Sequence, residues 1–251
     1  MYKRQIRTFF KDRDGRLWIG SEIGLDEFNY KDNTFIHYIL DKDDPYGLNT
    51  FAIHDDRFGN LWIGTYGVGL FKFDKITDKI VHYLYDSNNP RSIGDDTIWK
   101  IFEDRQGNLW IGTSKGLNLY DYENDLFIRH LNDPEDANSI SGNKILTIFE
   151  KSSGQLWFGT TTGLNKLNTK DNFHTQLQFT RYTTENGLPT NTIHGILEDD
   201  HGNLWIATNK GLSNFDLEKK IFHNYDESDG LQDIEFSVNA CYKDSTTGML
   251  Y

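Results

Sequence analysis

The chain has 251 residues with 38 acidic and 26 basic side chains, and its formal net charge of −12 argues against nucleic acid or another polyanion as partner, because neutralising phosphates takes clustered Lys and Arg. Cys241 is the single cysteine, which excludes an intrachain disulfide and a cysteine-based zinc site. Aromatic residues at 14% and 22 glycines favour short strands joined by tight turns, and the sequence has no run of about 18 apolar residues to span a membrane.

The sequence contains five copies of one pattern. Each copy has Leu-Trp-(Ile or Phe)-(Gly or Ala) followed four or five residues later by Gly-Leu, and the tryptophans stand 44, 48, 47 and 48 residues apart. They are Trp18, Trp62, Trp110, Trp157 and Trp205. Even spacing is typical of a structural unit, whereas a catalytic motif normally occurs once. We expect repeats at about 5–48, 49–95, 96–142, 143–190 and 191–236, and an incomplete last blade at 237–251.

In chain order, the third repeat predicts four strands. The segments TIWKIFED, NLWIGT, LNLYDY and LFIRHL read as strands, with turns at RQG and SKG. Four short strands in ~45 residues are what one propeller blade requires. The predicted fold is therefore all-β: a β-propeller of four-stranded antiparallel blades, a partial ring of about five blades plus the start of another. The innermost strands should include Thr50–Asp55, Ile98–Glu103, Ile145–Glu150 and Ile193–Glu198.

The residues that recur near each tryptophan have mechanical explanations. In four repeats an Asp precedes a turn glycine by three residues, a spacing at which its carboxylate accepts backbone N–H bonds while Gly takes a positive φ. Lys151 replaces this Asp in the fourth repeat. The aspartates are Asp12, Asp56, Asp104 and Asp199, and the glycines are Gly15, Gly59, Gly107, Gly154 and Gly202.

We expect each tryptophan to fill the space between neighbouring blades, with a small residue two positions later where another backbone or ring approaches. These small residues are Gly20, Gly64, Gly112, Gly159 and Ala207. On this interpretation Trp110→Ala costs ~3–5 kcal/mol. Replacing Trp18 or Trp205 by alanine should lower the free energy of unfolding by less, because these two residues have fewer neighbours in an open fragment.

The histidines share no spacing that would make metal ligands converge, so no metal site and no cofactor is predicted. One position of the fourth strand is polar in every repeat, and we interpret this column as solvated edge protection. It consists of His37, His82, Arg129, Arg181 and Asn224.

The sequence lacks Gly-x-Ser-x-Gly, a phosphate loop and His-Glu-x-x-His. No catalytic residue is therefore predicted. A glycosidase-like carboxylate pair in a channel mouth stays open as an alternative, with Asp95 and Asp96 as the first candidates. The other interpretation of these two residues is that they cap the loop entering the third repeat's first strand.

A ligand surface is predicted where the connections from the fourth strand to the next first strand meet the turns between second and third strands, because both loop sets surround one channel mouth. The prolines that stiffen the first set are Pro45, Pro90, Pro134 and Pro189. Tyr66 can stack on a sugar, and polar residues at the first-strand entrances can bond hydroxyls, although capping would also explain them. The candidate ligand residues are Tyr66, Asn49, Asp96, Trp99, Asn143, Asn191, Arg91 and Lys210.

The pattern D-x-x-G-x-LWIGT-x-x-GL, with a D-x-x-x-P-x-S-I loop as in YLYDSNNPRSIGDDTIWKIFEDRQGNLWIGTSKGLNLYD, resembles the two-component regulator propeller repeat over residues 5–251. The resemblance implies seven-bladed propellers, commonly two in tandem, in the periplasmic part of membrane-anchored hybrid two-component sensors, many of them glycan-responsive. Residues 237–251 resemble the family's last blade. The membrane span, kinase and receiver domains are then expected in segments missing from this chain.

The predicted function is a sensor or ligand-binding propeller without enzymatic activity of its own, on the periplasmic side of the inner membrane. Its expected partners are an oligosaccharide or other small ligand and, in the full-length protein, a second copy. One alternative is a glycan-processing propeller enzyme, which a convergent carboxylate pair would support. The other is a protein-interaction scaffold, which a large exposed apolar patch would support.

Overall fold

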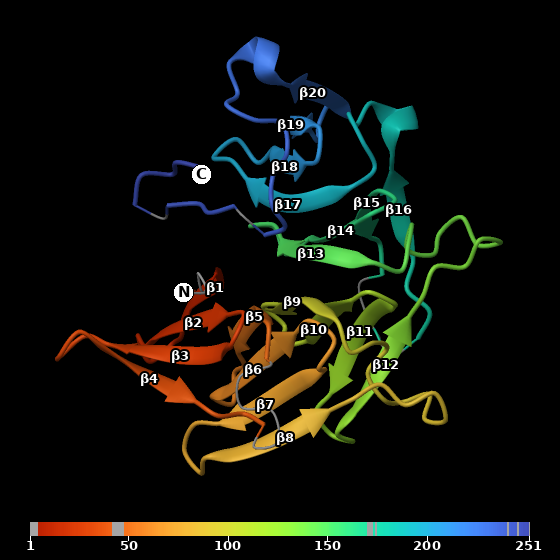
Figure 1. The fold of residues 1–251 in the computed structure, drawn as a ribbon. Helices are drawn as coiled ribbons and strands as arrows, with labels where there is room; N and C mark the ends of the chain where they lie inside the picture. The colour runs from red at the N-terminus through yellow and green to blue at the C-terminus, as the bar shows by residue number, and fades with distance from the viewer. Residues whose placement is uncertain are drawn as a thin grey trace. The chain divides into compact units, whose positions relative to one another are not determined.

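The computed structural model describes residues 5–41, 48–169, 173, 175–239, 241–244 and 246–250. In this part of the chain the helices are two short 3₁₀ turns, Thr184–Asn186 and Glu227–Asp229, and neither is long and apolar enough to cross a membrane. The strands form five four-stranded antiparallel sheets, in each of which the strands neighbour one another in chain order (Figure 1). The predicted all-β fold class and four-stranded blade are confirmed.

The chain divides into two compact units, and the first comprises residues up to 114 together with 118–129. It carries the blades of the first three repeats. Blade 1 consists of β1 (Ile6–Lys11), β2 (Leu17–Ser21), β3 (Gly24–Asn29) and β4 (Thr34–Tyr38). Blade 2 consists of β5 (Thr50–Asp55), β6 (Asn60–Thr65), β7 (Leu70–Asp74) and β8 (Lys79–Tyr83). Blade 3 consists of β9 (Ile98–Glu103), β10 (Leu109–Thr113), β11 (Gly116–Asp121) and β12 (Leu126–His130).

The second unit comprises residues 115–117 and those from 130 onward. Blade 4 consists of β13 (Ile145–Glu150), β14 (Leu156–Thr160), β15 (Leu164–Leu167) and β16 (Phe179–Tyr182). Blade 5 consists of β17 (Ile193–Glu198), β18 (Leu204–Thr208), β19 (Gly211–Asp216) and β20 (Ile221–Tyr225). Among its described residues, the expected last blade at 237–251 contributes one isolated antiparallel bridge, between Lys243 and Leu250.

The four innermost strands predicted from the sequence have the bounds of β5, β9, β13 and β17. Within the first unit β5 lies beside both β1 and β9, and within the second unit β13 lies beside β17. In each unit the first strands of consecutive blades are therefore neighbours, as a propeller requires.

A β-bulge interrupts the first strand of every blade at its second residue. In β5, Thr50 pairs with Thr65 and Ala52 pairs with Gly64, so Phe51 has no partner in the ladder. A bulge re-aims the side chain of the extra residue. The five bulge residues are Arg7, Phe51, Trp99, Leu146 and His194.

In four blades the repeated Asp ties the turn between first and second strands to the tryptophan. Asp56 Oδ1 accepts the backbone N–H groups of Phe58 and Asn60 at 3.0 and 2.9 Å, and Oδ2 accepts the indole N–H of Trp62 at 2.8 Å. The same Oδ2–Nε1 distance is 2.9 Å for Asp12–Trp18, 2.9 Å for Asp104–Trp110 and 3.1 Å for Asp199–Trp205. The turn bonds were predicted from the sequence and are confirmed, whereas the indole bond was not foreseen.

The tryptophan rings pack toward the following blade. Trp62 is fully buried, and its ring centroid lies 4.7 Å from that of Tyr120 in β11 and 5.8 Å from that of Tyr83 in β8. In the second unit the ring of Trp157 contacts that of Phe215 in β19. These contacts agree with the predicted role of the ring between neighbouring blades.

The two end tryptophans differ from each other. Trp18 is fully buried in a cluster that includes Phe73 of β7, so it does not have the fewer neighbours from which a smaller loss of stability was expected. Trp205 is half-buried, which agrees with the smaller loss expected there.

In three blades the small residue two positions after the tryptophan lies against the next blade's first strand: Gly20, Gly64 and Gly159. A Cβ on Gly64 would lie 2.5 Å from Cγ2 of Ile98, and one on Gly159 would lie 2.7 Å from Cγ2 of Ile193. Separations below 3.0 Å require the neighbour to move. The close approach predicted from the sequence is thus present, although its partner is a side chain.

The polar column of the fourth strand is not merely solvated edge protection, and that interpretation is wrong for its two arginines. Arg129 Nε donates to the carbonyl of Ser92 at 2.7 Å, and Nη2 donates to the carbonyls of Asn89 and Ile93 at 2.9 and 3.1 Å. Arg181 makes the corresponding set of bonds in blade 4, to Ser139, Asp136 and Ile140. Each guanidinium therefore holds the segment that leads into its own blade.

Candidate functional site

Three aromatic side chains meet in the first unit, and we call them the rim cluster: Phe51, Tyr66 and Trp99. The ring centroids of Phe51 and Trp99 lie 5.5 Å apart, those of Tyr66 and Trp99 5.9 Å, and those of Phe51 and Tyr66 5.7 Å. Phe51 and Trp99 are bulge residues, and Tyr66 comes from the turn between β6 and β7. The Tyr66 side chain is 53% exposed, so its ring can contact a ligand.

Backbone hydrogen bonds fix the turn that carries Tyr66. The Tyr66 N–H donates to the carbonyl of Asn49 at 2.9 Å, and the N–H groups of Gly67 and Gly69 donate to the carbonyl of Asp96 at 3.1 and 2.8 Å. Both glycines have φ above +80°, which other residues rarely adopt. Trp99 Nε1 donates to Ser114 Oγ at 2.9 Å. The cluster is therefore held in place before any ligand arrives, which lowers the entropic cost of binding.

Arg7 extends the rim cluster into blade 1. Its guanidinium carbon lies 5.3 Å from the centroid of the Phe51 ring, and its Nη2 pairs with Oε1 of Glu22 at 2.6 Å. Reasoning from the sequence missed both Arg7 and Phe51. The signal for them is the repeat register, because both occupy the same position as Trp99 at the start of a first strand.

The polar residues at the first-strand entrances bind backbone. In three of them the side-chain Oδ1 accepts the N–H of the residue two positions after the preceding fourth strand. The pairs are Asp96 with Tyr85 at 2.7 Å, Asn143 with Asn132 at 2.7 Å and Asn191 with Thr184 at 2.8 Å. These bonds are the ones expected if the three residues cap the loops that they belong to. They leave fewer side-chain atoms of these residues to bind ligand hydroxyls. Asn49 differs, since its Oδ1 is buried without a hydrogen-bond partner among the described residues.

The two carboxylates suggested for an enzyme each accept a backbone N–H. Asp95 Oδ1 accepts the N–H of Thr97 at 2.9 Å, and the Asp96 carboxylate caps the connection described above. Across the described ranges, no group of three His, Cys, Asp or Glu side chains is placed to hold a metal ion. Pro45, one of the prolines predicted at the channel mouth, and His174, one of the chain's histidines, lie outside the described residues.

Arg91 is not brought to the rim cluster, and Lys210 belongs to the second unit. The carbonyl of Arg91 accepts the N–H of Phe127 in β12 at 2.9 Å, so the segment around Pro90 lies along the outer strand of blade 3. Lys210 is exposed in the turn between β18 and β19 of the second unit. Pro90 and Arg91 belong to the same connection between blades 2 and 3. This part of the connection lies at the outer strand and not at the predicted channel mouth.

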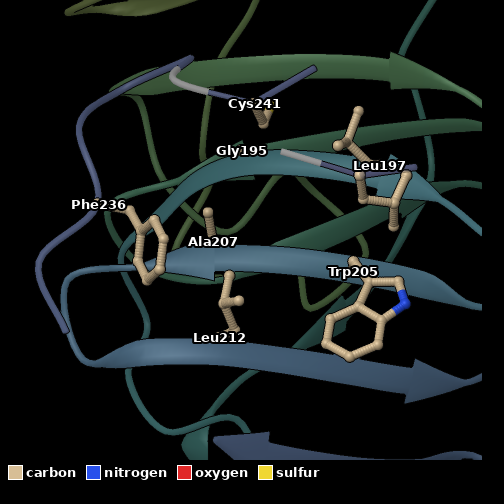
Figure 2. A pocket seen from close by; sticks show the side chains of 8 residues that line it. Gly195, Leu197, Trp205, Ala207, Leu212, Phe236 and Cys241 are labelled. Atoms are coloured by element: carbon tan, nitrogen blue, oxygen red, sulfur yellow. The ribbon is translucent and has the colours of Figure 1, made fainter. Parts of the chain in front are cut away.

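In the second unit the segment after β20 covers the corresponding bulge residues. Asn239 donates through its backbone N–H to the carbonyl of His194 at 2.9 Å and through Nδ2 to that of Leu146 at 3.3 Å. Figure 2 shows Phe236 and Cys241 beside the face of blade 5 that carries Trp205, around an apolar pocket of about 90 Å³. This lining suits packing better than recognition of a polar ligand.

His54 in β5 is half-buried beside the first strands of its neighbours. Its Nε2 accepts the backbone N–H of Glu103 at 3.1 Å, and its ring centroid lies 5.4 Å from that of Phe10. Burial lowers the pKa of His54 to about 3, and the positive charges of Lys100 and Arg13 act in the same direction. The imidazole is therefore neutral at neutral pH and links β5 to β9.

Five segments of the chain match the family model described as two component regulator propeller. They are residues 3–22, 47–67, 92–115, 139–162 and 187–210. Each contains part of the repeat that forms a blade. No curated protein matches the chain at a significant level.

Several solved structures are similar to this chain. The extracellular domain of the hybrid two-component system BT3049 from B. thetaiotaomicron is 29% identical with a TM-score of 0.84, over 98% of this chain and 32% of that one. The extracellular domain of the hybrid system BT4673 from the same organism is 20% identical with a TM-score of 0.66, over 100% and 41%. A virginiamycin B lyase from Staphylococcus aureus is 15% identical with a TM-score of 0.67, over 95% and 74%.

The similarities to BT4673 and to virginiamycin B lyase, at 20% and 15% identity, concern the fold alone. The chain spans about a third of the length of the BT3049 structure. The five sheets, the Asp–turn–Trp arrangement in four of them and the five matched segments agree with one another. The chain therefore carries five repeats of the two-component regulator propeller family.

Proposed function

We propose that the chain is part of the ligand-sensing region of a hybrid two-component signalling protein, placed outside the cytoplasmic membrane. The observation that carries this proposal is the 29% identity, over 98% of the chain, to the extracellular domain of such a system. The five family segments support it. The kinase that would receive the signal belongs to another part of the full-length protein.

The ligand in this proposal is an oligosaccharide bound at the rim cluster. The exposed ring of Tyr66 and the half-buried rings of Phe51 and Trp99 offer apolar surfaces of the kind that stack on sugar rings. The Arg7 guanidinium lies beside the Phe51 ring and offers hydrogen-bond donors for hydroxyls. An excess of acidic residues, with a net charge of −12, favours a neutral ligand over a polyanion.

Transmission would follow from differential binding. A ligand that prefers one arrangement of two protomers shifts the population toward it, and the kinase responds to that shift. In this proposal the chain binds and transmits without chemistry of its own. Virginiamycin B lyase shows that the fold also hosts an enzyme, but the capping bonds of Asp95 and Asp96 give no support to catalysis here.

The test is calorimetric titration of the protein with a panel of neutral oligosaccharides. For an oligosaccharide that binds, the double variant Tyr66→Ala, Trp99→Ala should lose about tenfold or more in affinity, because both ring contacts are removed. Tyr30→Ala is the matched control, since Tyr30 is 58% exposed in the turn after β3. Undiminished binding by the double variant, or an equal loss in the control, would contradict the assignment of this site.

A further inference from the structure

Blade 4 keeps the tryptophan of the repeat but lacks its acceptor. Lys151 stands where the other blades have Asp. Trp157 is 1% exposed, and its Nε1 is buried without a hydrogen-bond partner in the described part of the chain. In the other four blades a carboxylate oxygen lies 2.8–3.1 Å from this nitrogen. A buried donor is thus left where the repeat normally places a carboxylate.

Trp157 lines a pocket of about 250 Å³ inside the second unit. The walls come from β14, β15 and β16, from the turn between β13 and β14 and from the turn between β19 and β20. The polar and charged lining includes Lys151, Ser153, Lys166, Tyr182 and Lys220. Acidic side chains do not contribute to the described lining, so the pocket offers hydrogen-bond donors and positive charge.

A second carboxylate of the repeat is also replaced at this pocket. In blade 3, Asp125 has a φ of +53° and accepts the hydroxyl protons of Tyr83 and Tyr120, each at 2.6 Å. Lys220, with a φ of +59°, occupies the corresponding turn position in blade 5.

Tyr182 is the counterpart of Tyr83 in this arrangement. Its ring lies 5.8 Å from that of Trp157, the distance that separates Tyr83 from Trp62. The Tyr182 hydroxyl has no hydrogen-bond partner among the described residues, and burial raises its pKa. The Trp157 indole N–H and the Tyr182 hydroxyl are therefore both without an acceptor among the described residues, whereas their counterparts Trp62 and Tyr83 donate to carboxylates.

The positive charge of the pocket is only partly compensated. Lys151 Nζ donates to the carbonyl of Gly202 at 2.7 Å and lies 3.5 Å from Oε1 of Glu198. Lys166, the cross-strand partner of Trp157, and Lys220 form no ion pair with any residue that the structure describes. Two ammonium groups without a counter-charge thus border the cavity, on a chain whose net charge is −12.

We propose that this pocket binds a small organic carboxylate. The ligand's carboxylate accepts the Trp157 indole N–H and the Tyr182 hydroxyl, as Asp56 and Asp125 accept their counterparts, and Lys166 and Lys220 neutralise it. A carboxylate is the group the repeat itself places against this indole. The site does not rest on the proposed function. It lies at the strand ends that carry the turns between first and second strands, whereas the rim cluster lies at the opposite strand ends of its own blades.

Glucuronate is a suitable probe, with glucose as its neutral counterpart. The chain has six tryptophans, and the indole N–H signal of Trp157 is identified in an ¹H–¹⁵N spectrum by its loss in Trp157→Phe. Glucuronate should shift this signal in a saturable manner, and glucose should not. An unchanged signal, or an equal response to glucose, would overturn the proposal. An equal response to sulfate would overturn the choice of a carboxylate, leaving a general anion site.

The informative variant is Lys151→Asp, which restores the carboxylate found in the other blades. It should fold, give Trp157 its missing acceptor and lose the response to glucuronate, because the variant's own side chain occupies the ligand's position. Lys166→Gln and Lys220→Asn, which keep the strand and the turn, should each weaken binding about tenfold. Asn tolerates the positive φ of position 220. Wild-type affinity in a folded Lys151→Asp protein contradicts the proposal.

Discussion

The carboxylate of Asp56 and the indole of Trp62 are joined by a 2.8 Å hydrogen bond, and both side chains are fully buried. The other oxygen of the same carboxylate holds the turn between β5 and β6. One residue therefore fixes both the turn and the orientation of the ring that fills the space toward the next blade. Blade stability should depend on it more than on an ordinary surface carboxylate.

Asp56→Ala is expected to lower the free energy of unfolding by about 2–4 kcal/mol, because the substitution leaves a buried indole N–H and two turn N–H groups without their charged acceptor. Urea denaturation measures this change. Glu123→Ala, at an exposed turn position, is the control and should change stability by less than about 0.5 kcal/mol. Equal effects of the two substitutions would show that the Asp–Trp bond contributes little.

Trp62→Ala should cost about 3–5 kcal/mol, the range for deleting a buried aromatic ring. Trp18→Ala should cost a similar amount, since Trp18 is equally buried. Trp205→Ala should cost clearly less, because its ring is half-buried. Urea denaturation of the three variants ranks them, and a loss at Trp205 as large as that at Trp62 would contradict the packing described here.

His54 should make the protein sensitive to mild acid. Its pKa is about 3 in the folded chain against an ordinary value of 6.5, so the unfolded chain binds a proton in this interval and the folded chain does not. The stability contributed by neutral His54 is complete above about pH 6.5 and decreases as the pH falls toward 3, by up to about 1.4 kcal/mol per pH unit. His54→Gln, which does not titrate, should flatten this dependence between pH 6.5 and 5. Parallel curves for variant and wild type would argue against a neutral histidine at this position.

Arg129→Lys should loosen the segment from Asn89 to Ile93, because a single ammonium cannot reproduce the bonds that the guanidinium makes with several acceptors there. We expect a loss of about 1.5–3 kcal/mol and faster amide exchange in that segment. Arg91→Lys, at an exposed position of the same segment, should change neither quantity. Unaltered exchange in Arg129→Lys would restore the interpretation of this column as a solvated edge.

The fold was predictable because it is repeated. The recurring Trp and the turn glycines gave the four-stranded blade and the bounds of β5, β9, β13 and β17. Spacing alone did not reveal that the Asp reaches the indole, since this depends on the ring's rotamer. Nor did the polarity of Arg129 and Arg181 reveal the carbonyl groups that they bind.

The candidate site was predictable only in part. Tyr66 and Trp99, two of the candidate ligand residues, lie together, but the bulges that add Phe51 and Arg7 are a property of strand register. Asp96, Asn143 and Asn191 were chosen for hydrogen bonding to a ligand, and one oxygen of each side chain is occupied by a backbone N–H instead. Composition identifies a side chain's capacity to hydrogen-bond, whereas the fold decides which partner takes it.

Signalling by the hybrid two-component protein of our proposal is the most direct test of a sensor whose ligand binds at the rim cluster. A transcriptional reporter driven by that protein, with an oligosaccharide that binds the chain supplied, should respond in the wild type and in Tyr30→Ala. The response should be lost or shifted to about tenfold higher oligosaccharide concentration in the Tyr66→Ala, Trp99→Ala double variant. An undiminished response in the double variant, at normal protein levels, would contradict the assignment of the ligand site.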